Sequence, residues 1–135
     1  TFNVPHKEQL RYPIVTYIYS ADIKASYKTN ISWKEFQSGQ TLLKGKELKF
    51  KLRTNVPAPF DVYWQVVNTG QEAAIAGQLR GEISSQLNAA SGEIYRTEST
   101  SYTGDHWVEG FVIKDGVCVA KTGEFVVSVR DRFAA

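Results

Sequence analysis

The chain contains one cysteine, no methionine and only two histidines among its 135 residues. A single cysteine, Cys118, excludes an internal disulfide and is typical of a reducing compartment, so we expect a cytoplasmic location. Two distant histidines and one cysteine flanked by valines predict no transition-metal site. The sequence also lacks a phosphate-binding P-loop and the glycine pattern of dinucleotide-binding folds. We therefore expect no metal and no cofactor.

Charge of one sign and long apolar runs are also scarce. The 16 basic and 14 acidic residues leave a net charge of 16 − 14 = +2, which is too small to favour a binder of duplex nucleic acid. No window approaches the roughly 18 apolar residues of a membrane span, so we expect no membrane partner. Apolar and charged contents of 42% and 22% are globular values, and the length predicts one domain over residues 1–135. The start lacks both methionine and a signal-like apolar core, so we expect a fragment of a longer protein.

Two segments alternate apolar and polar residues with the period of a half-buried strand. The first runs from Lys46 to Thr54, and the second begins at Phe125 and forms the last strand. Each places its apolar residues on one face, and such faces must be buried against one another. The two strands therefore predict one shared core, made of Leu48, Phe50, Leu52, Phe125, Val127 and Val129.

Further short strands with intervening turns complete the pattern. An Asp115-Gly116 pair predicts a tight hairpin turn, because both residues tolerate positive φ angles. Residues 71–79 are the only credible helix, with Asn68 or Thr69 as a possible cap, and the polar residues 82–92 are interpreted as a loop. We predict an all-β fold, an antiparallel β-sandwich (Ig-like or a related barrel) with one short helix. The other expected strands are 11–19, 23–33, a short piece around 42–43, 60–67, 94–101, 106–113 and 117–120.

Polar and aromatic residues are unusually dense between Trp64 and Glu109. Arg80, between Leu79 and Gly81, could bind a phosphate bidentately or pair with Glu98 or Glu109. Tyr102 and His106 flank a Gly-Asp turn, where they could stack on a base and donate to a phosphate, or simply end a hairpin. Because such glycine-bearing segments let side chains escape the core, we expect these three to converge on one pocket.

Two further residues carry alternative interpretations. Asn68 precedes Thr69-Gly70 and is either a turn residue or a ligand contact. Trp64 shares a strand face with Val62 and Val66, which favours the core over a pocket. No residue is predicted to be catalytic. The candidate ligand-binding residues are Arg80, Tyr102, His106, Asn68, Trp64 and Glu98.

Three motifs resemble a known family. W-x-V-x-N-T-G-x-E-A begins at Trp64, L-R-G at Leu79, and E-x-T-x-Y-x-G-x-H-x-V-E at Glu98. They are similar to the sensor domain found at the C-terminus of bacterial adenylyl/guanylyl cyclases and SMODS-type nucleotidyltransferases. The resemblance extends over residues 36–129 and is less clear in the first 35 residues.

The resemblance implies a non-enzymatic module that binds a nucleotide or cyclic oligonucleotide. Its partner would be a nucleotidyltransferase domain in cis or an effector in trans, in a second-messenger system of anti-phage defence. Two other classes remain open from the residues alone. One is a carbohydrate- or protein-binding sandwich with an exposed platform of Trp33, Trp64 or Trp107. The other is an enzyme acting on nucleotides through Glu98 and His106.

Overall fold

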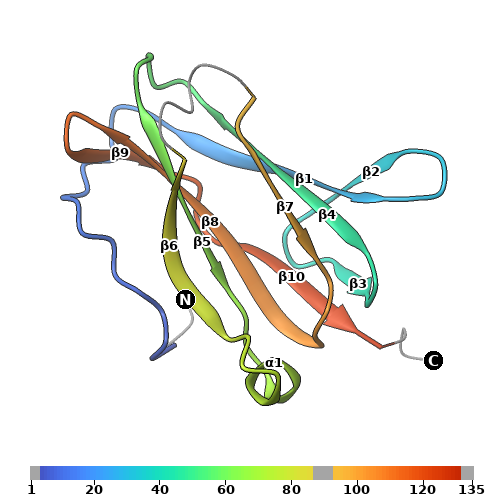
Figure 1. Ribbon diagram of the computed structural model, residues 1–135. Coiled ribbons are helices and arrows are strands. Elements are labelled where there is room, and N and C mark those ends of the chain that lie inside the picture. The colour runs from blue at the N-terminus through green and yellow to red at the C-terminus, as the bar shows by residue number, and fades with distance from the viewer. Residues whose placement is uncertain (1–3, 87–92, 132–135) are drawn as a thin grey trace.

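The computed structural model describes residues 4–86 and 93–131 and arranges them as two packed β-sheets (Figure 1). Within these residues the chain forms ten strands and one short helix. The helix lies at the end of the sandwich where the adjacent strands β5 and β6 are joined. In chain order the elements are β1 (Ala21–Lys28), β2 (Trp33–Phe36), β3 (Thr41–Leu43), β4 (Glu47–Thr54), β5 (Asp61–Val67), α1 (Gln71–Ile75), β6 (Arg80–Gln86), β7 (Tyr95–Ser99), β8 (Gly104–Lys114), β9 (Val117–Lys121) and β10 (Phe125–Arg130).

The strand order confirms the predicted β-sandwich. One sheet has the order β2-β1-β4-β7 and is antiparallel throughout. The other has the order β3-β10-β8-β5-β6, with β9 also paired to β8. One pair in this second sheet, β10 with β3, is parallel, so the sheet is mixed. Strands β6 and β7 are the edges of different sheets, and their side chains meet across the open side of the sandwich.

The core lies between the two sheets. All six residues predicted to share it belong to one buried cluster. Phe50 and Phe125 come from opposite sheets, and their ring centroids lie 5.7 Å apart in an edge-to-face arrangement. The alternation seen in the sequence therefore corresponds to the inner faces of β4 and β10. Within the part of the chain that the structure describes, no helix is long and apolar enough to cross a membrane.

Two predictions of regular structure were wrong. Residues 11–19 form no strand and contribute one isolated parallel bridge between Ile14 and Cys118. Pro13 has no backbone N–H to donate, and Tyr17 and Ile18 are 85% and 69% exposed. The segment has high strand propensity, but its side chains there do not pack against a sheet. The first half of the predicted loop 82–92 belongs to strand β6, which pairs with β5. Residues 87–92 of that prediction lie outside the described residues.

The helix is shorter than predicted and is capped differently. It has five residues, and its N-cap is Gly70 with no side-chain cap hydrogen bond. Asn68 instead donates its side-chain amide to the carbonyl of Gln78 at 2.8 Å, which closes the loop around the helix. The predicted hairpin turn is confirmed, since Asp115 and Gly116 join β8 and β9 with φ angles of 52° and 76°. The weak strand prediction 23–33 covers most of β1 and the start of β2.

Candidate functional site

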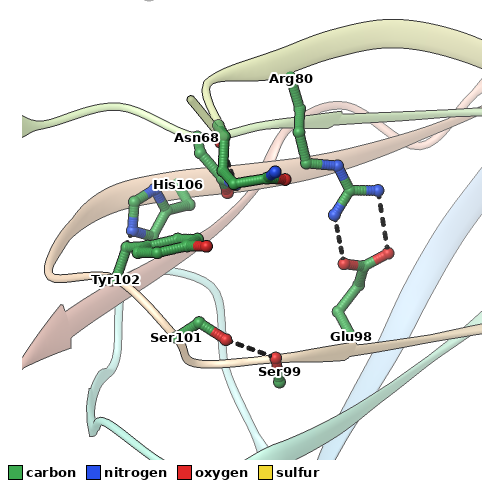
Figure 2. Close-up of a pocket in the computed structure, with 8 residues that line it drawn as sticks. Asn68, Arg80, Glu98, Ser99, Ser101, Tyr102 and His106 are labelled. Atoms are coloured by element: carbon green, nitrogen blue, oxygen red, sulfur yellow. Dashed lines mark hydrogen bonds and ion pairs between the residues drawn. The ribbon is translucent and has the colours of Figure 1, made fainter. Parts of the chain in front are cut away.

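A polar cavity of about 180 Å³ lies at the end of the sandwich where β5 ends and β6 begins (Figure 2). The end of β7 and the loop from β7 to β8 form its opposite wall. Five of the six predicted ligand-binding residues line this one cavity. Its full lining is Asn68, Gln78, Arg80, Glu98, Ser99, Ser101, Tyr102 and His106.

Arg80 and Glu98 form the most strongly charged part of the cavity. Arg80 Nη1 donates to Glu98 Oε1 at 2.6 Å, and Nη2 lies 3.4 Å from Oε2. The same carboxylate accepts a hydrogen bond of 2.8 Å from Arg96 Nε. Two guanidinium charges against one carboxylate leave a net charge of 2 − 1 = +1. The pairing that the sequence left open is therefore with Glu98, and the group retains an attraction for anions.

The backbone of Arg80 is also unusual. Its φ angle is 60°, in the left-handed region that side-chain-bearing residues rarely adopt. Such a conformation costs about 1–3 kcal/mol and persists only where the surroundings determine it. The guanidinium of this first β6 residue points towards Glu98 on β7, in the other sheet (Figure 2). Arg80 is therefore held at the seam between the sheets by its backbone as well as by its ion pair.

His106 contributes its ring to the cavity wall, but both ring nitrogens bond to backbone groups. Nδ1 lies 3.0 Å from the Thr69 amide nitrogen, which donates to it, and Nε2 lies 2.8 Å from the Tyr102 carbonyl. This pattern requires the neutral tautomer with the proton on Nε2. Gly104 lets the two loops approach, because a Cβ there would lie 2.7 Å from the Thr69 carbonyl oxygen. His106 therefore joins the two loops that build the cavity. From the sequence, His106 could donate to a phosphate, but in the structure neither ring nitrogen is free to do so.

Burial lowers the pKa of His106 below its ordinary value of 6.5, against an opposing effect of the Tyr102 hydrogen bond. The unfolded chain therefore takes up the proton first, and the free energy of unfolding should fall as the pH drops below about 6.5. We expect the free energy of unfolding to fall less in His106→Gln than in the wild type when urea unfolding is measured between about pH 7.5 and 5.5. His6→Gln, at the partly exposed second histidine, is the matched control. Parallel pH profiles for wild type and His106→Gln would contradict the prediction.

Tyr102 and Asn68 complete the predicted set within the cavity. Tyr102 is half-buried, and Figure 2 shows its hydroxyl end directed towards the side where Arg80 and Glu98 lie. The side-chain amide of Asn68 donates to Gln78, while the backbone carbonyl of Asn68 accepts a hydrogen bond from His6 Nε2. Asn68 is therefore both a turn residue and a lining residue. The two interpretations that the sequence left open do not exclude each other.

Trp64 does not join the others. It is buried in the core, and its indole nitrogen donates to Gln86 at 3.1 Å. Trp107 is also fully buried, so Trp33 is the only exposed tryptophan of the three. Glu109, the alternative partner for Arg80, is buried on the outer face of its sheet, and burial raises the pKa of its carboxyl group. The tryptophan platform of the carbohydrate-binding alternative is thus reduced to one residue.

The sequence interpretation missed three lining residues and one supporting arginine. Ser99 and Ser101 lie inside the same motif as Glu98 and Tyr102, and their hydroxyls are 2.7 Å apart. Arg96 stands two residues before Glu98 on β7, so a period of two places both on one face. That spacing could have predicted the arginine. Gln78 carries no such signal, because its position depends on where the short helix ends.

The fold and the cavity define a β-sandwich module with a polar pocket at its seam. The family model of the Adenylyl/Guanylyl and SMODS C-terminal sensor domain matches residues 2–130. The chain therefore belongs to this sensor-domain family. The match includes the first 35 residues, whose resemblance was less clear from the motifs. A comparison with curated proteins finds no match.

Proposed function

We propose that this domain senses a nucleotide through the pocket at its seam. The observation that carries the proposal is the placement of Arg80 in the pocket, within an ion-pair group of Arg80, Glu98 and the adjacent Arg96 whose net charge is +1. The remaining lining is polar and supplies hydroxyl and amide groups from Ser99, Ser101 and Gln78. A guanidinium with hydroxyl and amide groups beside it is suited to a phosphate, which accepts several hydrogen bonds at once and competes with Glu98 for Arg80.

The size of the pocket limits what it holds. Its volume of about 180 Å³ lies below the ~300–1,000 Å³ of pockets that enclose a whole drug-sized ligand. We infer that one phosphate and the adjoining sugar or base enter, while the rest of the nucleotide stays outside. Tyr102 is placed to stack against a base, an interaction of about 1–3 kcal/mol per base. Arg80 would then hold the phosphate.

The family membership supports a signalling role for this binding. In our proposal the ligand is a second-messenger nucleotide or cyclic oligonucleotide in bacterial anti-phage defence. The binding signal passes to a nucleotidyltransferase domain in cis or to an effector in trans. A ligand can act in this way only if it binds two conformations of the domain with different affinity. Catalysis through Glu98 and His106 has little support, because two arginines hold the carboxylate and backbone groups hold both imidazole nitrogens.

A thermal-shift screen tests the proposal. The panel contains ATP, GTP, AMP, GMP, cyclic di-AMP and cyclic di-GMP, with adenosine and guanosine as controls that lack phosphate and a set of mono- and oligosaccharides for the alternative. A ligand at a hundredfold excess over its Kd stabilises the folded state by about 2.7 kcal/mol, which raises the Tm by several degrees. We expect at least one phosphate-bearing member to raise the Tm, and its nucleoside to have less effect. If mono- and oligosaccharides raise the Tm and no nucleotide does, the carbohydrate-binding alternative replaces this proposal.

A further inference from the structure

The N-terminal segment of residues 4–10, here called the strap, runs past the edge strand β6 on its way to β9 (Figure 1). Its Glu8 amide donates to the carbonyl of Gly81 at 3.0 Å, and the Ile83 amide donates to the Glu8 carboxylate at 3.2 Å. Both partners belong to the strand that begins with Arg80. The strap therefore contacts β6 next to the residue that enters the pocket.

Gly81 shows how closely the strap approaches. Its φ angle is 120°, and a Cβ atom added to it would lie 2.4 Å from the carbonyl oxygen of His6. That distance is far inside van der Waals contact, and the obstructing atom belongs to the backbone, so it cannot rotate away. A residue with a side chain at this position is incompatible with the present position of the strap. Only glycine allows both the strap contact and the turn that follows Arg80.

A buried glutamine reinforces the contact. Gln65 on β5 is 1% exposed, and its Nε2 donates to the carbonyl of Glu8 at 2.9 Å and to that of Gly81 at 2.7 Å. One amide group thus ties together the strap and strands β5 and β6. Between the strap and the sheet further along, a hollow of about 400 Å³ is lined in part by Tyr12 and Tyr63. The strap is held by these hydrogen bonds and also by packing, since Leu10 contacts the buried cluster of Phe111, Ile113 and Cys118.

The strap reaches a second residue of the pocket from behind. His6 Nε2 lies 3.0 Å from the carbonyl oxygen of Asn68, whose side chain lines the pocket. The strap therefore contacts Asn68 directly, and it contacts Gly81, the residue that follows Arg80. The strap does not have to enter the pocket in order to influence the positions of the pocket walls. The backbone positions of two pocket walls depend on where the strap lies.

We propose that His6 and Glu8 of the strap are positioning residues for the nucleotide pocket, with Gly81 as the contact through which they act on Arg80. The proposal rests on the proposed nucleotide binding of the same pocket. If the strap holds Arg80 in its left-handed conformation, release of the strap weakens nucleotide binding. Linkage then requires that bound nucleotide tightens the strap by the same factor.

The test compares Gly81→Ala with Gly116→Ala. Gly116 also has a positive φ angle, but nothing lies within 4 Å of an added Cβ, so Gly116→Ala introduces an alanine at positive φ without a clash. His6→Ala is a milder second variant, which removes one hydrogen bond from a partly exposed residue and is expected to fold. Hydrogen exchange of the Glu8 amide and titrations with ATP, GTP and cyclic di-GMP are measured on the 135-residue chain.

We expect Gly81→Ala to speed exchange at Glu8 and to weaken nucleotide binding on the order of tenfold. His6→Ala should do the same to a smaller extent, and Gly116→Ala should do neither. Saturating nucleotide should slow Glu8 exchange in the wild type, which a merely structural strap would not show. Nucleotide binding that leaves Glu8 exchange unchanged in the wild type, or equal affinity in Gly81→Ala and Gly116→Ala, overturns the positioning role alone. If the wild type binds no nucleotide, the proposed function fails, and the positioning role fails with it.

Discussion

Replacing Phe50 with alanine is expected to lower the free energy of unfolding by about 3–5 kcal/mol. Phe50 is fully buried on β4, and its ring lies 6.4 Å from that of Phe36 and 5.7 Å from that of Phe125. Truncation removes both edge-to-face contacts and leaves a cavity between the sheets, which the surrounding strands can fill only in part. A domain of this size has a total stability of about 5–15 kcal/mol, so the variant should be close to unfolding at ambient temperature.

Urea unfolding followed by circular dichroism measures this effect, with Tyr17→Ala as the matched control. Tyr17 loses a side chain of similar size but is 85% exposed, so its replacement should change stability by less than about 0.5 kcal/mol. The comparison separates burial from aromatic content. Similar losses in the two variants would mean that Phe50 does not occupy the inter-sheet core.

The core could be predicted because two strands carry their own pattern. In β4 and β10 buried apolar residues occupy every second position, and this alternation predicts the inner face without tertiary information. The Asp115-Gly116 turn is equally local, since it depends on the φ angles that two adjacent residues tolerate. Both patterns depend only on residues that are close together in the sequence.

The errors arose where a partner strand decides the outcome. Residues 11–19 have high strand propensity, yet the available edge next to Cys118 accepts only a single bridge at Ile14. Strand β6 has the opposite character, because it lies in a polar stretch rich in Ser, Ala and Asn that suggests a loop. It is an edge strand whose regular conformation comes from pairing with β5. Propensity alone assigns both segments incorrectly, because pairing is a long-range property.

The candidate site divides in the same way. Glycine-bearing segments predicted that Arg80, Tyr102 and His106 would leave the core, and the structure lines one cavity with all three. Their roles depend on contacts between distant parts of the chain. The ring of His106 is engaged by Thr69, 37 residues away, and Arg80 by Glu98, 18 residues away. No spacing rule selects Glu98 over Glu109 as the partner, so the sequence left that choice open.

Arg80→Ala and Glu98→Gln are expected to change nucleotide affinity in opposite directions. Arg80→Ala removes a charge-assisted contact to phosphate of roughly 1.5–3 kcal/mol, which weakens binding about ten- to over a hundredfold. Glu98→Gln keeps the shape of the side chain but removes the negative charge that occupies both Nη atoms of Arg80. The freed guanidinium and the more positive pocket should strengthen binding of a phosphate-bearing nucleotide by a few-fold.

Isothermal titration with the nucleotide that most stabilises the wild type measures both changes, after circular dichroism has shown that each variant folds. Lys49→Ala removes the same charge as Arg80→Ala from the outer face of β4, away from the pocket, and should leave affinity nearly unchanged. If the Arg80–Glu98 salt bridge served only to join β6 and β7, both substitutions would break it and open the seam. Nucleotide binding would then be weaker in both variants. Loss of affinity in Glu98→Gln alone would instead assign the carboxylate to donors on the ligand, such as ribose hydroxyls. Unchanged affinity in Arg80→Ala would make Arg80 a structural residue and would remove the phosphate contact on which the proposed function depends.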